Sequence, residues 1–105
     1  MAIITNPTVQ NGAMLTAQGQ KTFLNLTATT LVKTTAGRVA KVNVLVAGGT
    51  NTGAVYDSAT IGGIGAANQI ATIPDAVGSY LIDFPCSNGI VIAPGTGNTV
   101  AVSYL

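Results

Sequence analysis

The stretch Val39-Ala40-Lys41-Val42-Asn43-Val44-Leu45-Val46-Ala47 has the clearest alternation of residue types in the chain. In a β-strand, successive side chains point to opposite faces of the sheet. One face of this stretch carries Val42, Val44 and Val46, and the other carries Lys41, Asn43 and Leu45. Because valine recurs at every second position, the stretch predicts a β-strand with one aliphatic face.

Shorter stretches of the same kind make up most of the chain from residue 22 onward. Valine, isoleucine and threonine favour strands and are abundant, whereas no segment has a convincing helical period. The 13 glycines and 4 prolines fall between the apolar stretches, as turn residues do. The other predicted strands are residues 22–27, 29–34, 54–58, 69–73, 80–84, 89–93 and 99–104.

Three local features add detail to this pattern. Within residues 22–27, we expect Phe23 on the face opposite Leu24 and Leu26. The small, glycine-rich stretch 59–68 predicts an ordered but irregular crossing. The pair Asn88-Gly89 indicates a β-hairpin, because both residues accept the positive φ angles of a tight two-residue turn.

About eight strands, with turns about every 8–12 residues, predict an all-β protein. We expect an antiparallel, jelly-roll-like β-sandwich. An immunoglobulin-type sandwich fits less well, because the chain has no Trp and only one Cys. We expect the sandwich domain over residues 22–105. Residues 1–21 predict an N-terminal arm or an added edge strand, with a frayed terminus as the alternative.

Charge is scarce in this chain. Charged residues make up 7% of it, against roughly 25% in an ordinary soluble domain. The charged residues are Lys21, Lys33, Arg38, Lys41, Asp57, Asp75 and Asp83, and the net charge is +1. A neutral surface can lie against another neutral surface with little desolvation cost. We therefore expect an oligomer or an assembly component, with a monomer solubilised by Thr, Asn and Gln as the alternative.

The composition also argues against nucleic acid and membrane as partners. Nucleic-acid binding needs clustered Lys and Arg, and the three basic residues within 33–41 are interpreted as a solvated edge or turn. The longest apolar runs are far below the roughly 18–20 residues of a membrane span. Residues 1–7 show no basic region followed by a long apolar stretch, so we expect no secretory signal.

The residues favour a role without catalysis. The chain has no His, the commonest base for a Ser or Cys nucleophile. Its three carboxylates, on Asp57, Asp75 and Asp83, show no spacing typical of glycosidases or calcium loops. We interpret Asp57 and Asp75 as turn or edge residues. We expect no enzyme, and no catalytic, cofactor-binding or metal-ligating residue.

The glycine-rich stretches, the tyrosines and the cysteine each have a structural interpretation. Residues 48–53 lack the ending of a phosphate-binding P-loop, and no helix follows Gly63-Ile64-Gly65. A lone cysteine cannot form an internal disulfide, and Cys86 is interpreted as a small buried hydrophobic residue. The tyrosines could form a sugar-stacking platform, although packing with a hydrated hydroxyl is more common. They are Tyr56, Tyr80 and Tyr104.

The segments that carry a family resemblance are soft strand and turn patterns. They are Leu31-Val32-Lys33, Gly37-Arg38-Val39 with Val42-Asn43-Val44, Gly53-Ala54-Val55-Tyr56-Asp57-Ser58, Asn88-Gly89-Ile90-Val91-Ile92 and Gly95–Tyr104. Together they resemble the head decoration, or cement, proteins of tailed bacteriophages, which stabilise the head. The resemblance covers about residues 29–105, and residues 1–28 lie outside it.

The resemblance implies a jelly roll or sandwich that binds the outside of an assembled capsid and clamps neighbouring copies of the major capsid protein. It further implies a dimer or trimer on the capsid surface of the virion, made in the host cytoplasm, with no small-molecule substrate. It transfers no functional residue, because the family has no fixed binding motif. The alternatives are another virion component, such as a head fibre base, tail or baseplate protein, and a carbohydrate-binding β-sandwich module.

Overall fold

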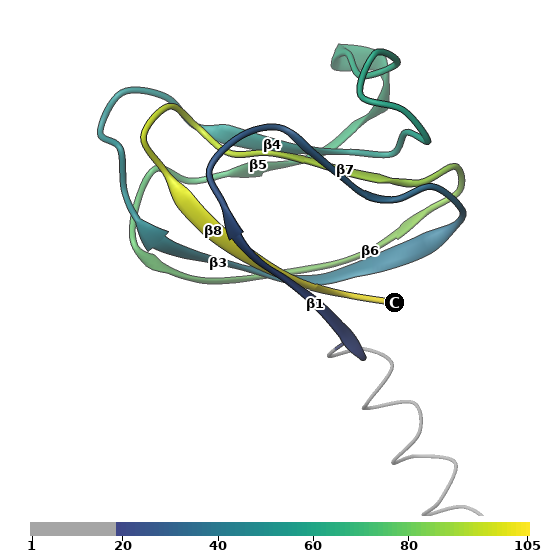
Figure 1. The fold of residues 1–105 in the computed structure, drawn as a ribbon, viewed down its shortest axis with the longest axis horizontal. Helices are drawn as coiled ribbons and strands as arrows, with labels where there is room; N and C mark the ends of the chain where they lie inside the picture. The colour runs from purple at the N-terminus through teal and green to yellow at the C-terminus, as the bar shows by residue number, and fades with distance from the viewer. Residues whose placement is uncertain (1–18) are drawn as a thin grey trace, which may run out of the picture.

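A computed structural model describes residues 19–105, which form two antiparallel four-stranded sheets packed face to face (Figure 1). Sheet A has the strand order β1-β8-β3-β6, and sheet B has the order β2-β7-β4-β5. The strands are β1 (Lys21–Leu26), β2 (Thr30–Lys33), β3 (Gly37–Val46), β4 (Gly53–Tyr56), β5 (Gln69–Ile73), β6 (Gly78–Cys86), β7 (Ile90–Ala93) and β8 (Thr99–Tyr104).

The strand order is that of a jelly roll. The first strand pairs with the eighth, the second with the seventh, the third with the sixth and the fourth with the fifth. The chain is thus one long nested hairpin, folded so that alternate pairs enter opposite sheets. The pairings β3–β8 and β4–β7 then close each sheet. The predicted all-β, jelly-roll-like sandwich of about eight strands is confirmed.

The core between the sheets is built from small aliphatic side chains. In sheet A, Val42 lies opposite Val102 and Val44 lies opposite Val100. Burial of each such side chain contributes roughly 1.5–3 kcal/mol. The buried core residues are Leu26, Val32, Val39, Val42, Val44, Val55, Ile73, Cys86, Ile90, Ile92, Val100 and Val102.

Each of the four edge strands carries one more residue than its inner partner at one point of the ladder. The extra residue is Val32 in β2 and Ile70 in β5. In β1 and β6 the bulges contain the only described non-glycine residues with positive φ, Asn25 at 58° and Asp83 at 46°. A bulge breaks the regular row of unpaired N–H and C=O groups at an edge, so all four edges are poor templates for an added strand.

Bulges also overturn two expectations about which side chains share a face. Phe23 and Leu26 pair with Val102 and Val100, so they face the same side, because the bulge inserts an extra residue between them. Val46 does not join Val42 and Val44: the register shifts after Val44, and Val46 is 52% exposed. Strict alternation predicts neither result, because one inserted residue exchanges the two faces.

The prediction of a β-hairpin at Asn88-Gly89 is also wrong. The strands on either side of this turn, β6 and β7, belong to different sheets and do not pair. The turn instead carries the chain across the edge of the sandwich. The stretch 59–68 is ordered and irregular as predicted, with one 3₁₀ turn at Ala66–Asn68, but it joins β4 and β5, which are adjacent in sheet B.

The predicted arm or edge segment, residues 1–21, falls mostly outside the described residues. Its last residue, Lys21, is the first residue of β1 and lies opposite Tyr104. The preceding residue, Gln20, donates its backbone N–H to the Tyr104 carbonyl oxygen over 3.0 Å. Sheet A therefore begins within the last two residues of the segment.

Cys86 lies in the core, as the sequence predicts, and is 2% exposed. Burial, with a smaller contribution from the negative charge of Asp57, raises the pKa of its thiol to about 11. We therefore predict that a thiol reagent at pH 8 modifies the folded protein at least about 100-fold more slowly than the protein in urea, because the thiolate is the reactive form. The reaction is measured by the absorbance of the released reagent group. Rapid modification of the folded protein would contradict the burial of Cys86.

Candidate interaction surfaces

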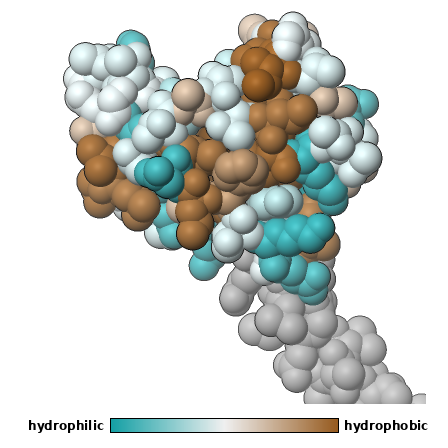
Figure 2. Space-filling model, in the orientation of Figure 1, coloured by the Kyte–Doolittle hydropathy of each residue, from teal (hydrophilic) through white to brown (hydrophobic). Residues whose placement is uncertain are grey.

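The outer face of sheet A combines exposed aliphatic side chains with neutral polar ones. Strand register and alternation place the following residues on it: Thr22, Leu24, Lys41, Asn43, Leu45, Val46, Ser79, Leu81, Ala101 and Ser103. Its four large aliphatic members, Leu24, Leu45, Val46 and Leu81, are more than half exposed, and Leu81 reaches 68%. Figure 2 shows apolar side chains gathered at the end of the sandwich where β3 ends and β6 begins.

Charge on this side of the molecule is largely neutralised. Arg38 and Asp83, beside the face, form an ion pair with 2.8 Å between Nε and Oδ1. Such an exposed pair contributes only about 0–1 kcal/mol to stability, but it leaves little net charge at that end. Among the described residues of the outer face, Lys41 is the one charged side chain outside this ion pair. The Ser79 hydroxyl and the Asn43 side-chain oxygen lie 2.6 Å apart and are hydrogen-bonded to each other.

The three basic residues within 33–41, interpreted from the sequence as a solvated edge or turn, are divided between the two sheets. Lys33 belongs to sheet B, and its Nζ donates to the Leu105 carbonyl oxygen over 3.1 Å. Arg38 and Lys41 both belong to β3 of sheet A, but Arg38 is paired with Asp83. The described residues of this region therefore form no concentrated basic patch.

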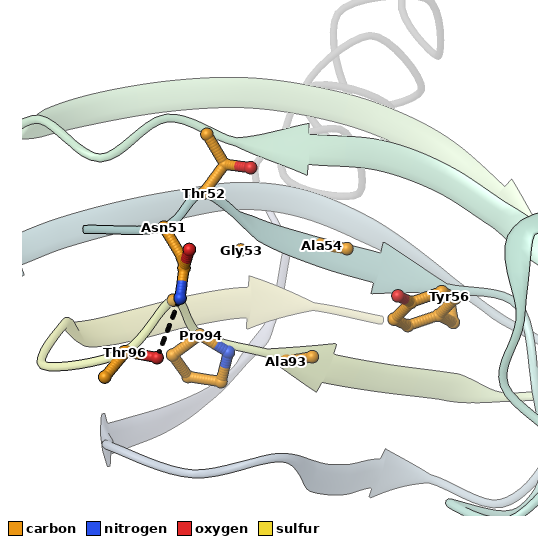
Figure 3. Close-up of a pocket in the computed structure, with 9 residues that line it drawn as sticks. Asn51, Thr52, Gly53, Ala54, Tyr56, Ala93, Pro94 and Thr96 are labelled. Carbon is orange, nitrogen blue, oxygen red and sulfur yellow. Dashed lines mark hydrogen bonds between the residues drawn. The ribbon is translucent and has the colours of Figure 1, made fainter.

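The outer face of sheet B has a groove of about 380 Å³. Its lining comes from β4, the end of β7 and the two loops beside them (Figure 3). The lining residues are Asn51, Thr52, Gly53, Ala54, Tyr56, Ala93, Pro94, Gly95 and Thr96. Figure 2 shows the molecule hollowed above sheet B, between the loops at its two ends. None of these nine described residues is charged.

Glycine allows the two loops that border the groove to pack backbone against backbone. A Cβ at Gly48 would overlap the Thr96 carbonyl oxygen, and a Cβ at Gly95 would overlap the Asn51 carbonyl oxygen. Side chains then join the loops, because Asn51 Nδ2 donates to Thr96 Oγ1 over 3.0 Å. The two loops that form this wall of the groove are therefore fixed to each other by backbone contacts and by a side-chain hydrogen bond.

A single backbone group ties three loops together at this end of the sandwich. The Gly48 N–H is directed at Oδ1 of Asp75, 2.9 Å away, and at Oδ1 of Asn98. Asn98 is 1% exposed, and its Nδ2 has no hydrogen-bond partner among the described residues. Asp75 is thus a turn residue, as predicted, and it connects its turn to the loop after β3.

Asp57 performs the matching role at the opposite end. Its carboxylate accepts the backbone N–H groups of Ser87, Asn88 and Gly89 over 2.9, 2.8 and 3.3 Å. Partial burial alone would raise its pKa, but these three hydrogen bonds together hold the pKa below its ordinary value. The carboxylate therefore fixes the turn that crosses from sheet A to sheet B.

The three tyrosines form no common platform. Tyr80 and Tyr104, both of sheet A, pack against the core, and the Tyr80 hydroxyl donates to the Ala76 carbonyl oxygen over 2.8 Å. Tyr56 lies on sheet B and lines the groove. Sequence reasoning found Tyr56 as a candidate ligand-contacting residue, but it missed Asn51, Thr52 and Thr96, which ordinary loop composition does not distinguish.

Comparison with known proteins gives no match to a family model, to a curated protein or to a solved structure. Within residues 19–105, no helix is long and apolar enough to cross a membrane. The same residues include no group of three or more His, Cys, Asp or Glu side chains that could hold a metal ion.

We predict that Asp57→Asn lowers the free energy of unfolding by about 1–2 kcal/mol at pH 7, because the amide replaces a charged acceptor of three N–H groups. The folded-state pKa is depressed, so this stabilisation is full above about pH 3.9 and is lost as the pH falls below that value. Urea denaturation of both proteins should show their difference shrinking with acidity. An unchanged difference at low pH would contradict the role of the carboxylate.

We also predict that Gly48→Ala lowers the free energy of unfolding by roughly 1–3 kcal/mol, because the added methyl group meets the Thr96 carbonyl oxygen. Gly62→Ala is the matched control, since a Cβ there would meet nothing within 4 Å. The control should be neutral or slightly stabilising. Equal urea midpoints for the two variants would show that the loops do not pack as described.

Proposed function

We propose that this protein is a virion structural protein that decorates the outside of a bacteriophage capsid and cements it. In this proposal, the outer face of sheet A packs across the junction between neighbouring major capsid proteins. The observation that carries the proposal is the exposure of Leu24, Leu45, Val46 and Leu81 on one nearly uncharged face. Exposed apolar patches with polar surroundings mark protein interaction sites.

The composition of the face suits protein contact. The cores of protein interfaces are depleted in charge, and their rims are polar. Here the aliphatic residues are interspersed with Asn43, Ser79 and Ser103, whose polar groups can form hydrogen bonds with a partner. Lys41 sits near the centre, between Leu81 and Ser103 in register, and its flexible chain can carry the ammonium group to the rim.

The edges of the sandwich support attachment through a face. Proteins can also join by adding a strand to an exposed edge, but each described edge strand is bulged. Sheet A ends in β1 and β6, whose bulges contain Asn25 and Asp83. A face that buries apolar area without matching a hydrogen-bond ladder is therefore the better surface for this chain.

Two further considerations favour a capsid. Jelly rolls are common in viral capsids, and residues 29–105 resemble phage decoration proteins; both are arguments from likeness. Repetition over a symmetric shell turns a modest interface into a large total stabilisation, and self-association as a dimer or trimer would add avidity. A head fibre base, tail or baseplate protein could use the same face, so the location on the particle distinguishes them.

We predict that virions lacking the protein release their genome at a lower temperature than complete virions, and that adding the purified protein back raises the release temperature to that of complete virions. Leu81→Lys should weaken rebinding at least about tenfold, because it places a charge in the buried interface. Thr72→Lys, an exposed change on sheet B, should rebind like the wild type.

Genome release is measured with a DNA-binding dye during heating, and rebinding is measured by co-sedimentation. Electron microscopy of virions to which the protein has been added back then shows whether the bound protein lies on the head. Equal heat stability with and without the protein would rule out cementing. Copies found on the tail or baseplate would favour the other virion components.

A further inference from the structure

We propose that the groove on the outer face of sheet B binds a neutral saccharide. This inference is independent of capsid attachment, which uses the opposite sheet. The two outer faces point in opposite directions, so a copy held through sheet A would present the groove away from the capsid (Figure 1). The groove's volume of about 380 Å³ lies within the range of small-ligand sites.

The aromatic group of the groove is Tyr56, the last residue of β4. Its partner in register on β7 is Val91, which alternates outward from the core residues Ile90 and Ile92 and is nevertheless 0% exposed. Val91 is therefore covered on the outer face, and Tyr56 lies directly beside it across the ladder. The Tyr56 hydroxyl points along the groove toward Ala54 and Ala93 (Figure 3).

The floor of the groove is made of very small residues. Ala54 of β4 and Ala93 of β7 lie opposite each other in register, and Gly53 precedes Ala54 on β4. Because these side chains are no larger than a methyl group, a sugar ring has room to lie flat against the sheet. Because the face of an aromatic ring is electron-rich, it attracts the C–H groups of such a ligand at Tyr56. The ring of Pro94 adds a second apolar contact.

Several polar groups along the groove have unused hydrogen-bonding capacity. Asn51 uses its Nδ2 to bind Thr96, which leaves the Asn51 side-chain oxygen as an acceptor and the Thr96 hydroxyl proton as a donor. The hydroxyls of Thr52 and Tyr56 form no hydrogen bond with other described residues. A short row of acceptors and donors of this kind matches the hydroxyls of a sugar, each of which both donates and accepts.

The described lining residues carry no charge, which favours a neutral ligand over an anionic one. A phosphate, a sialic acid or an acidic peptide is best held by Lys or Arg, and neither is among the described residues that line the groove. A neutral peptide is less favoured, because the floor of Ala54, Ala93 and Gly53 has no deep apolar pocket for its side chains. The packed glycines and the Asn51–Thr96 bond hold the wall in place, so binding costs little ordering of the loops.

The test uses the full chain and millimolar methyl glycosides of glucose, galactose, mannose and N-acetylglucosamine, followed by an array of neutral and acidic glycans. We expect at least one neutral sugar to bind and to shift the amide NMR signals of residues 51–54 and 93–96. Tyr56→Ala should weaken that binding at least about tenfold. Tyr56→Phe, which keeps the ring, should retain more of the affinity than Tyr56→Ala.

The matched controls are Thr52→Ala, inside the groove, and Thr72→Ala, exposed on sheet B outside it. We expect the first to weaken binding and the second to leave it unchanged, with thermal unfolding confirming that each variant is folded. Lack of binding by every neutral glycan, shifts elsewhere on the protein, or preference for acidic glycans would overturn the proposal. Because capsid rebinding is measured separately, such a failure would leave the attachment proposal standing.

Discussion

The packing of β3 between β6 and β8 is the interaction on which the rest of the structure depends. β3 is the longest strand, and Val42 and Val44 extend from it into the core opposite Val102 and Val100. Because β8 then pairs with β1, and β6 leads into the turn toward β7, one central strand sets the positions of sheet A and of the crossings into sheet B. Burial of aliphatic area along β3 drives this arrangement.

Two polar contacts at opposite ends keep the sandwich closed where aliphatic packing stops. The Asp57 carboxylate holds the turn between β6 and β7, and the Gly48 N–H joins the loops that contain Asp75 and Asn98. Thus two of the three acids in the chain satisfy backbone groups that would otherwise be left unpaired at the ends of the sandwich. Few charges remain for the surface, which explains how the outer faces stay nearly neutral.

The two outer faces have different chemistry, and this difference underlies the two proposals. Sheet A presents large aliphatic side chains among neutral polar ones, which suits a broad protein contact. Sheet B presents a floor of small residues beside Tyr56 and a row of amide and hydroxyl groups, which suits a small polar ligand. A neutral jelly roll with bulged edges can use both faces at once, because neither sheet edge is needed for attachment.

The sequence by itself determined the all-β class, the approximate strands and the burial of Cys86, because period-two alternation and turn residues are local properties. It could not determine the bulges between Phe23 and Leu26 and between Val44 and Val46, since an inserted residue is defined only by the partner strand. The facing of Leu26 relative to Phe23, and of Val46, was therefore mispredicted. Asn88-Gly89 likewise showed a turn but not which sheets it joins. Only the tertiary structure brought Asn51, Thr96 and Tyr56 into one groove, because they lie on segments that approach each other through β4–β7 pairing and close glycine contacts.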